Sequence, residues 1–329
     1  MKKTIAIVCG GDSPEHDVSM RSAEGIASFI DPVHYIIYKV EIHAGKWEAL
    51  LPDGKRSRVN RDDFSFEAEG KTVSPDLAYI TIHGAPGENG ELQGYFDLIG
   101  MPYSTCGVLV EAMTYDKFVL NNYMRAFGVS VADSLLVKTG HDKEVTDEEI
   151  VERIGLPCFV KPSRGGSSFG TTKVKTIEAL RPAIELALGE GEDAMVEAFM
   201  QGTELTCGCY KTRQKSVVFP ITEVVSKNEF FDYDAKYKGE SDEITPARIS
   251  ERLAGRVSKL TSMIYDILGC HGIIRIDYIV TEGDKINLLE INTTPGMTSA
   301  SFIPQQVRAA GLDIRDVMTD IIEDRLTRS

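Results

Sequence analysis

The chain opens with an arrangement of apolar and polar residues that is typical of a β-turn-α unit. An apolar run from Thr4 to Cys9 leads into Gly10-Gly11, and Ser13-Pro14 then predicts a helix N-cap and a first helical position. The apolar segment 23–30 continues this helix. We therefore expect the first apolar run to be a buried strand that begins an α/β sheet.

A second unit repeats this order further along the chain. Residues 77–82 form an apolar run, 83–90 a glycine-rich loop, and 91–99 an amphipathic segment that predicts a helix. Both turns should lie at the carboxyl ends of parallel strands, where α/β sheets bind ligands. A ligand site is therefore expected beside the two turns.

The rest of the chain predicts two further units. The three units together are expected to span residues 1–102, 103–202 and 203–329. In the central unit, the expected elements are helices at 115–127 and 146–154 and a strand at 158–162. In the last unit, they are strands at 203–210 and 216–222, a polar aromatic loop at 226–245, a helix at 246–269 and a hairpin at 273–292.

The hairpin carries the most informative polar pattern. Its strands alternate in polarity around Gly283-Asp284, which suits a two-residue turn. This register places Asp277 opposite Glu290, and Arg275 opposite Asn292 on the same face. Opposed carboxylates destabilise a sheet unless a cation lies between them, and oxygen-only ligands favour Mg²⁺ shared with phosphate. The alternative is a solvent-facing strand surface with an ordinary ion pair.

A second glycine-rich loop, at 163–170, follows an apolar strand that ends at Lys161-Pro162. Its glycines would let backbone N–H groups approach an anion, so the loop is expected to cover phosphate; a plain surface loop is the alternative. Lys161 lies inside the apolar strand and therefore needs a buried anionic partner. Lys117 and Lys236 are further candidate phosphate ligands.

The segment 230–237 mixes aromatic and charged residues within a predicted loop. This composition favours a flap that closes over a ligand, whereas local packing of the aromatic residues is the alternative. Glu15 at a helix N-terminus and His83 at a strand end can each be explained by structure alone when they are considered separately.

Composition narrows the classes of partner. A formal net charge of -14 and a pI near 5.0 argue against nucleic acid and anionic membranes. The six cysteines lack a CxxC pair and are expected to be buried thiols of a reduced compartment. The first apolar run is too short for an export signal, so the expected location is the cytoplasm. P-loop and dinucleotide fingerprints are missing from the sequence, so any nucleotide should bind in another way.

Together these segments resemble the D-alanine:D-alanine ligases of the ATP-grasp superfamily, in the same order over nearly the whole chain. The matching strings are 10–19, 83–94, 115–117, 160–168, 233–237, 275–277 and 289–298. The resemblance implies an α/β, three-domain ATP-grasp fold with an N-terminal parallel-sheet domain. It also implies a homodimer that joins two D-alanine molecules into D-alanyl-D-alanine for peptidoglycan precursors. ATP would phosphorylate the first D-alanine, the amine of the second would attack the acyl phosphate, and ADP and phosphate would be released.

The resemblance also implies roles for individual residues. Those expected to bind the first D-alanine are Glu15 and His83, and Ser301 would receive the carboxylate of the second. The expected oxyanion donors are Arg275 and the backbone of Gly296, and the expected links between Glu15 and the flap are Ser167 and Tyr237. The residues expected to bind ATP are Lys117, Lys161, Glu197, Ala198, Phe199, Met200, Glu204 and Lys236. Those expected to hold two Mg²⁺ or Mn²⁺ ions are Asp277, Glu290 and Asn292.

The chain departs from the usual residues of the family at Gly165, Ile274, Ala300 and Phe302. Phe302 borders the expected second-substrate pocket, so an ATP-grasp ligase that uses a different amine or a hydroxy acid is an alternative. Tyr237 favours an amine, because members that make D-alanyl-D-lactate lack this tyrosine. A nucleotide-binding regulator without catalysis is a further candidate function, but it would need neither a second metal ion nor an oxyanion donor. A dehydrogenase is the weakest candidate, because the sequence lacks the dinucleotide-binding fingerprint.

Overall fold

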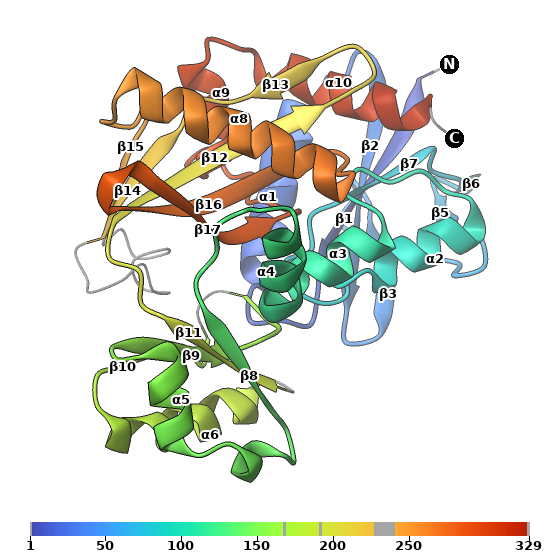
Figure 1. Ribbon diagram of the computed structural model, residues 1–329. Helices are drawn as coiled ribbons and strands as arrows, with labels where there is room; N and C mark the ends of the chain where they lie inside the picture. The colour runs from blue at the N-terminus through green and yellow to red at the C-terminus, as the bar shows by residue number, and fades with distance from the viewer. Residues whose placement is uncertain (1, 167–168, 191–192, 227–240, 328–329) are drawn as a thin grey trace.

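The computed structural model describes residues 2–166, 169–190, 193–226 and 241–327. Its strands form three main sheets and one short hairpin, and helices surround the sheets (Figure 1). This mixed architecture confirms the predicted α/β class. None of the helices in the described part of the chain has the length and apolar character needed to span a membrane.

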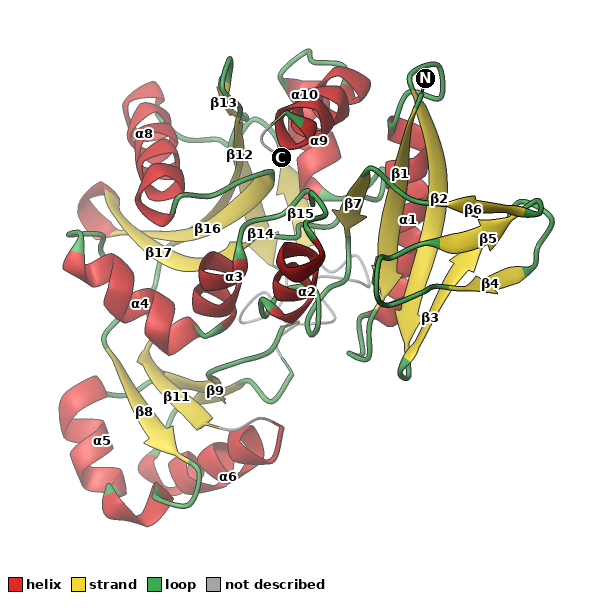
Figure 2. Cartoon of the chain, turned by 90° about the vertical axis from the view of Figure 1, so that its right-hand side faces the viewer, coloured by secondary structure: helices red, strands yellow, loops and turns green. Residues whose placement is uncertain are grey.

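The first sheet has the strand order β4-β3-β2-β1-β7. Its strands are β1 (Lys3–Gly10), β2 (Tyr35–His43), β3 (Lys46–Leu50), β4 (Arg56–Arg58) and β7 (Leu77–Ile80). β1 is parallel to both β2 and β7, as the two β-turn-α units predict. The helices after the two turns are α1 (His16–Phe29) and α2 (Glu91–Ile99), and α1 lies along one face of the sheet (Figure 2). The separate hairpin consists of β5 (Phe66–Ala68) and β6 (Lys71–Val73).

The start of α1 differs from the sequence prediction. The helix begins at His16 with Glu15 as its N-cap residue, so the prediction that Ser13 caps the helix and Pro14 begins it is wrong. Ser13 Oγ instead donates to the carbonyl oxygen of His83 at 2.8 Å and accepts from the backbone N–H of Glu15 at 3.2 Å. The serine therefore ties the two turns of the first sheet together.

The second sheet is antiparallel, with the strand order β10-β9-β11-β8. Its strands are β8 (Ser134–Lys138), β9 (Cys158–Pro162), β10 (Thr172–Val174) and β11 (Asp193–Ala198). The helices packed on it are α5 (Asp147–Ile154) and α6 (Leu180–Glu190), with short 3-10 turns at Asp142–Glu144 and Ile177–Ala179. The buried cluster of this sheet draws only on residues 135–196, so the sheet forms a lobe of its own (Figure 1).

The third sheet has the strand order β15-β14-β12-β16-β17, with β13 paired to β12. Its strands are β12 (Thr203–Lys211), β13 (Ser216–Val218), β14 (Thr222–Ser226), β15 (Ser241–Ile244), β16 (Ile273–Thr281) and β17 (Lys285–Asn292). The helices around it are α3 (Val108–Tyr115), α4 (Lys117–Ala126), α8 (Glu251–Leu268), α9 (Phe302–Ala309) and α10 (Ile314–Leu326). α3 and α4 contribute to the core of this sheet although they fall in the range expected for the central unit. The predicted domain boundaries stay predictions.

A buried cluster also joins the last two helices to the first sheet. Tyr79 on β7 lies 3.7 Å through its hydroxyl from the sulfur of Met318 on α10. Tyr35 on β2 donates to Glu323 on the same helix at 2.6 Å. These contacts fasten the first sheet to the third, and so fix the loops of both sheets relative to each other.

The β16–β17 hairpin has the predicted facing carboxylates but reaches them through a different turn. Three residues, Glu282–Asp284, form the loop, so the predicted two-residue turn is wrong. Leu289 is left unpaired, because the register shifts after Asp277. The extra loop residue and this bulge compensate, and Asp277 still faces Glu290.

Candidate active site

A cavity of about 280 Å³ lies between the start of α1, the loop after β7, Gly165 and Gly166 of the glycine-rich loop, and the loop after β17. The predicted site residues in its wall are Glu15, His83, Lys117, Arg275, Glu290, Asn292, Gly296 and Ser301. The fold therefore brings these residues together from segments far apart in the chain. Asp277 and the predicted adenine-binding residues lie outside this wall.

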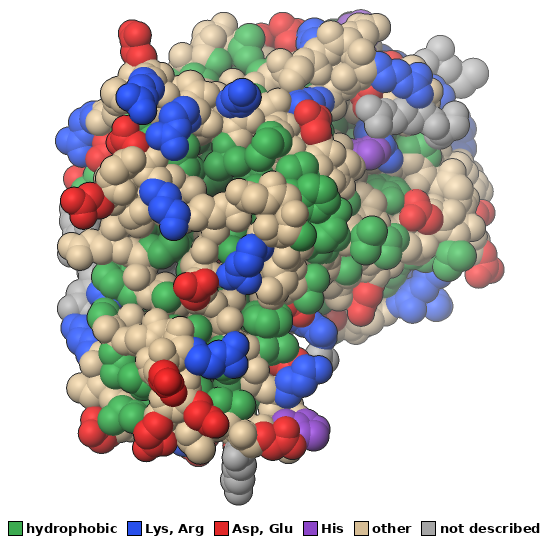
Figure 3. Space-filling view, viewed as in Figure 1, with side chains coloured by type: hydrophobic (Ala, Val, Ile, Leu, Met, Phe, Trp, Pro, Cys, Tyr) green, Lys and Arg blue, Asp and Glu red, His purple; other side chains and the backbone are tan. Residues whose placement is uncertain are grey.

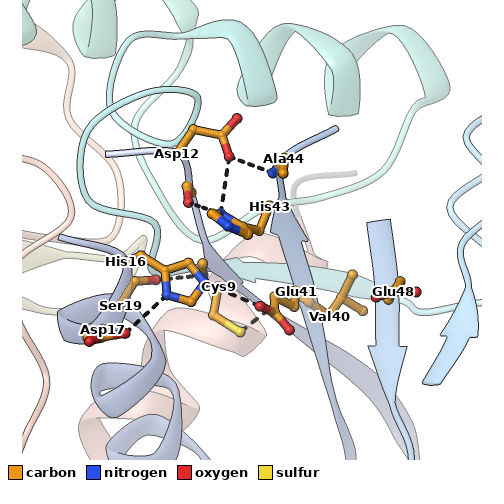
Figure 4. A network of polar contacts seen from close by, with 12 residues as sticks. Cys9, Asp12, His16, Asp17, Ser19, Val40, Glu41, His43, Ala44 and Glu48 are labelled. Carbon is orange, nitrogen blue, oxygen red and sulfur yellow. Dashed lines mark hydrogen bonds and ion pairs between the residues drawn. The ribbon is translucent and has the colours of Figure 1, made fainter. Parts of the chain in front are cut away.

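A polar network holds the start of α1 against β2 (Figure 4). His16 Nε2 lies 3.2 Å from the Oε1 atom of Glu41 on β2. His43, at the end of β2, packs on His16 with 4.5 Å between ring centres, and its Nδ1 lies 3.2 Å from Asp12 Oδ1. Because Glu15 directly precedes α1, these contacts hold its backbone at the cavity wall.

His83 is buried at the same wall, with 6% of its surface exposed. Burial lowers the pKa of His83, and the Glu15 carboxylate offsets only part of this effect, so the imidazole is neutral near pH 7. Its Nε2 atom has no hydrogen-bond partner among the described residues. A buried nitrogen in this position is suited to a polar group of a ligand.

Glu88 shares this wall, although no role was predicted for it. Its Oε2 atom accepts from the backbone N–H of Gly84 at 2.7 Å. Burial raises the pKa of Glu88 to about 8, and the nearby Glu15 raises it as well. Glu88 is therefore largely protonated at neutral pH, which limits the negative charge next to Glu15.

Four more residues line the cavity although the sequence analysis assigned them no role. They are Arg21, Tyr115, Glu243 and Thr294. Tyr115 and Thr294 lie in strings that match the ligases, which was the signal available for them. Arg21 and Glu243 lie outside those strings, so only the fold reveals their position.

The glycine-rich loop is attached to the start of α4. Asp116 accepts from Ser163 Oγ at 2.7 Å and from Arg164 Nε at 3.1 Å. Lys117 Nζ donates to the carbonyl oxygen of Gly165 at 2.5 Å. An added Cβ atom on Gly166 would lie 2.8 Å from an oxygen of Glu15, so the loop backbone closely approaches this carboxylate. Gly165 and Gly166 therefore form part of one side of the cavity, as expected for a segment that covers phosphate.

The helix predicted at 115–127 is confirmed as α4, which begins at Lys117, directly after Asp116. The residue separates α3 from α4 and caps α4 by accepting from the backbone N–H of Val119 at 3.1 Å. This break places the side chain of Lys117 at the cavity, in the first turn of α4.

The polar face of the hairpin gathers around Asp277. Arg275 binds its carboxylate through Nε at 3.0 Å and through a terminal nitrogen at 2.8 Å. Thr206 Oγ1 donates to Asp277 at 2.5 Å, and Asn292 Nδ2 donates to it at 3.3 Å. The same guanidinium lies 4.0 Å from Glu290 Oε1, so it stands between the two carboxylates. The ordinary ion pair considered as an alternative is thus present between Arg275 and Asp277.

The donor atoms of Asp277, Glu290 and Asn292 are all suited to a hard cation. Oxygen ligands from two adjacent strands match the preference of Mg²⁺ or Mn²⁺. Among the described residues, no group of three or more His, Cys, Asp and Glu side chains is placed to hold a metal ion. Two carboxylates and one amide would need further oxygen ligands, so the set fits a cation that arrives with phosphate groups.

Lys161 has the buried anionic partner that its position in an apolar strand requires. Its Nζ lies 2.6 Å from Glu197 Oε2 on the neighbouring strand β11, and Asn121 Nδ2 donates to the other oxygen of Glu197 at 3.3 Å. Phe199, just after β11, packs on Phe159 with 6.0 Å between ring centres. The predicted ATP residues 197–200 thus run from β11 toward β12, where Glu204 lies opposite Ile279 on β16.

Three predicted site residues cannot be placed. Ser167, Lys236 and Tyr237 lie outside the described residues. All six cysteines are buried and free, as predicted.

Comparison with known proteins gives matches over the whole chain. A family model described as the D-ala D-ala ligase N-terminus matches residues 4–106, and one described as the D-ala D-ala ligase C-terminus matches residues 123–323. A D-alanine–D-alanine ligase of Phocaeicola vulgatus is 66% identical, covering 99% of this chain and 100% of that protein. One from Porphyromonas gingivalis is 48% identical and covers 100% of both chains.

Solved structures give the same result. The VanG D-Ala:D-Ser ligase from Enterococcus faecalis superimposes with a TM-score of 0.88 at 31% identity, covering 98% of this chain and 99% of that one. D-alanyl-alanine synthetase A from Vibrio cholerae has a TM-score of 0.88 at 26% identity, covering 99% of both chains.

Proposed function

Because the chain belongs to the D-alanine–D-alanine ligase family, we propose that it uses ATP to join two D-alanine molecules into D-alanyl-D-alanine for peptidoglycan precursors. The fold is that of the ATP-grasp ligases, as the sequence predicts. The observation that carries the proposal is the shared cavity, which Glu15 and His83 line from one side and Arg275 and Glu290 from the other.

The first D-alanine would bind beside α1. The Glu15 carboxylate is suited to its ammonium group, and His83 would lie near its carboxylate. Lys117 and the loop at 163–170 would hold the transferring phosphoryl group against this carboxylate. Phosphoryl transfer would yield ADP and an acyl phosphate.

The second D-alanine would attack the acyl phosphate through its amine. Arg275 and Gly296 line the cavity, and the guanidinium of Arg275 and the backbone N–H of Gly296 would donate to the oxyanion that develops on the attacked carbonyl. Ser301 would receive the carboxylate of this second substrate, and phosphate would leave as the tetrahedral intermediate collapses. Ser167 and Tyr237 are proposed to connect Glu15 with the flap, as the family resemblance implies.

ATP would lie between the second and third sheets. The proposed contacts are Lys117, Lys161 and Lys236 with the phosphates, and Glu197, Ala198, Phe199, Met200 and Glu204 with adenine and ribose. Asp277, Glu290 and Asn292 would hold two Mg²⁺ or Mn²⁺ ions, which offset negative charge on the phosphates when bound. The oxygen-only donor set supports this assignment.

A different acceptor is the second candidate. The guanidinium of Arg275 lies 5.3 Å from the ring centre of Phe302, at a position where Leu is common in the family. This ring changes the wall of the second-substrate side, and a D-Ala:D-Ser ligase is among the similar structures. D-serine and D-lactate are therefore acceptors that the enzyme should be offered beside D-alanine.

We further propose a homodimer that works in the cytoplasm. The family resemblance implies the homodimer, and Leu98 and Leu109 on α2 and α3, which expose 88% and 73% of their surfaces, are the apolar residues that we propose for its interface. Free, buried cysteines and the use of ATP are consistent with a reduced compartment. On the face in Figure 3, acidic and basic side chains are interspersed, which is consistent with small-molecule partners rather than nucleic acid.

The test is a product assay with ATP and Mg²⁺. Phosphate release is measured with D-alanine, L-alanine, D-alanine plus D-serine, and D-alanine plus D-lactate, and the products are identified by mass. We expect D-alanyl-D-alanine as the main product and no turnover with L-alanine. A preference for the mixed D-serine product would support the second candidate, and ATP binding without any turnover would contradict both.

A further inference from the structure

Glu243 places a carboxylate in the cavity wall from β15, the edge strand of the third sheet. Its Oε2 atom accepts from Gln305 Nε2 at 2.5 Å. Gln305 lies in α9, and the same nitrogen donates to the carbonyl oxygen of Ala300 at 2.6 Å. Glu243 is thereby fixed against the segment that carries Ser301, the residue expected to receive the second substrate.

Keeping the Glu243 carboxylate ionised in this partly buried position costs free energy. Burial raises the pKa of Glu243, and the hydrogen bond from Gln305 and the positive charge of Arg275 lower it only in part. Within the described residues, Glu243 has no ion pair with Lys or Arg, and Gln305 is its hydrogen-bond partner. A glutamine would satisfy the same contact, so the contact alone does not explain why the residue is charged.

The charges around Glu243 match those of an amino acid. Ser301 lines the same cavity and is the residue expected to receive the carboxylate of the second substrate. Glu243 is suited to a cation, and the apolar side chains of Ala300 and Phe302 line the wall beside these groups. An amino acid with a small apolar side chain would therefore place its carboxylate at Ser301 and its ammonium group toward Glu243.

We propose that Glu243 binds the ammonium group of the second amino acid and so selects an amino acid over a hydroxy acid as acceptor. This inference rests on the proposed function and concerns the binding step, before the amine loses its proton and attacks. A hydroxy acid offers only a carboxylate, which the Glu243 charge repels without any compensating contact. The residue would act alongside Tyr237, which the family resemblance already associates with an amine acceptor.

The experiment compares the unaltered enzyme with Glu243→Gln and Glu243→Asp. Glutamine keeps the size and the contact with Gln305 but removes the charge, whereas aspartate keeps the charge. The matched control is Glu282→Gln, which removes a charge from the exposed hairpin loop of the same sheet. Each protein is assayed for the KM of both D-alanine sites, the KM of ATP, and the products formed from equal D-alanine and D-lactate.

For Glu243→Gln, we expect the KM of the second D-alanine to rise roughly tenfold, as for loss of a charge-assisted contact. The KM values of the first D-alanine and ATP should stay within about twofold, because this charge change acts at the acceptor side. The ratio of D-alanyl-D-lactate to D-alanyl-D-alanine should rise by a similar factor. Glu243→Asp should stay closer to the unaltered enzyme, and Glu282→Gln should match it.

A measurement without any substitution covers the case in which Glu243→Gln does not fold. Raising the ionic strength screens a partly exposed charge, so the preference for D-alanine over D-lactate should fall between about 0.05 and 0.5 M salt. If Glu243→Gln leaves the KM of the second D-alanine and the product ratio unchanged, this inference is overturned and the proposed function is not affected. If the variant does not fold, a preference for D-alanine over D-lactate that does not change with salt would overturn the inference instead. Failure of the unaltered enzyme to make any dipeptide would overturn the proposed function, and this inference with it.

Discussion

The ammonium group of Lys161 lies 2.6 Å from the carboxylate of Glu197, and both side chains are almost completely buried. The two residues lie on the neighbouring strands β9 and β11, and Asn121 contacts the second oxygen of Glu197. Such a pair is stable because each charge compensates the other where water cannot. Removing one partner leaves the other charge buried and unpaired. This removal should therefore lower the free energy of unfolding by more than the intact pair contributes to it.

We predict that Lys161→Met lowers the free energy of unfolding by about 3 to 5 kcal/mol, because it leaves the Glu197 carboxylate buried and unpaired. Urea unfolding without nucleotide measures this change. Combining it with Glu197→Gln should recover part of the loss, since the buried charge is then removed. Lys138→Met, an exposed change in the same sheet, is the control and should have little effect. If Lys161→Met and Lys138→Met had equal free energies of unfolding, the prediction would be contradicted.

The need of Lys161 for an anion was visible in the sequence, because a lysine inside an apolar strand is stable only when an anionic group lies beside it. The facing of Asp277 and Glu290 was also predicted correctly, but through an incorrect turn. A strand pattern of period two shows which side chains share a face, and it says little about a loop residue and a bulge that cancel each other. The parallel units and the α/β class followed from apolar runs and turns.

Some parts of the site depend on contacts that the linear pattern does not contain. The helix α3 before Asp116 was not predicted, and the capping role of Asp116 depends on a side-chain contact with the next turn. Ser13 was predicted to cap α1, but its hydroxyl is held by the distant carbonyl of His83. Glu243 lies on β15 at one edge of the third sheet, in a segment that was predicted to be a loop. Tertiary contacts decided these positions.

Glu111 makes the stability of the protein depend on pH. The side chain is completely buried on α3, and Thr293 Oγ1 donates to it at 2.5 Å. Burial raises the pKa of Glu111 well above its ordinary value, and the nearby Cys106 adds to this effect. The native state therefore keeps a proton that the unfolded chain releases above its ordinary pKa of 4.5.

The protonated Glu111 side chain contributes fully to the free energy of unfolding below that ordinary pKa. This contribution is lost as the pH rises toward the higher pKa of the native state. The unfolding free energy should fall by up to about 1.4 kcal/mol per pH unit in this window. Glu111→Gln cannot release a proton, so its unfolding free energy should fall less than that of the unaltered protein between about pH 5.5 and 8.5. Urea unfolding at several pH values measures both curves. Parallel curves would show that this carboxyl group does not titrate differently in the two states.

Gly166 is a test of how closely the loop approaches the first-substrate site. Gly166→Ala would place a Cβ atom 2.8 Å from the Glu15 carboxylate, so either the loop or Glu15 must move. We expect the KM of the first D-alanine to rise roughly tenfold or more, because a displaced positioning group weakens ligand alignment. Gly189→Ala, where the added atom meets nothing within 4 Å, is the control. Steady-state kinetics on both variants would decide, and identical KM values would contradict a close approach of this loop to Glu15.

The exposed leucines on α2 and α3 test the proposed homodimer. Leu109→Arg places a charge in the suggested interface and should shift the protein from dimer to monomer, with little change in monomer stability because the residue is exposed. Sedimentation velocity at several concentrations measures this shift. The exposed Leu312, toward the end of the chain, provides the control Leu312→Arg. A Leu109→Arg variant that remains dimeric would place the interface elsewhere.

Glu290 tests the metal assignment most directly. Glu290→Gln preserves the size of the side chain and its place opposite Asp277, so thermal unfolding should change by only a few degrees. It removes one of the two carboxylates, and we expect phosphoryl transfer to fall roughly a hundredfold or more. The Mg²⁺ concentration that gives half of the remaining activity should also rise, since the donor set is weaker. Glu282→Gln, in the exposed loop of the same hairpin, should keep normal turnover and the normal Mg²⁺ requirement. Full activity of Glu290→Gln would show that the facing carboxylates do not hold the metal, and that the pairing of Arg275 with Asp277 is the main role of this polar face.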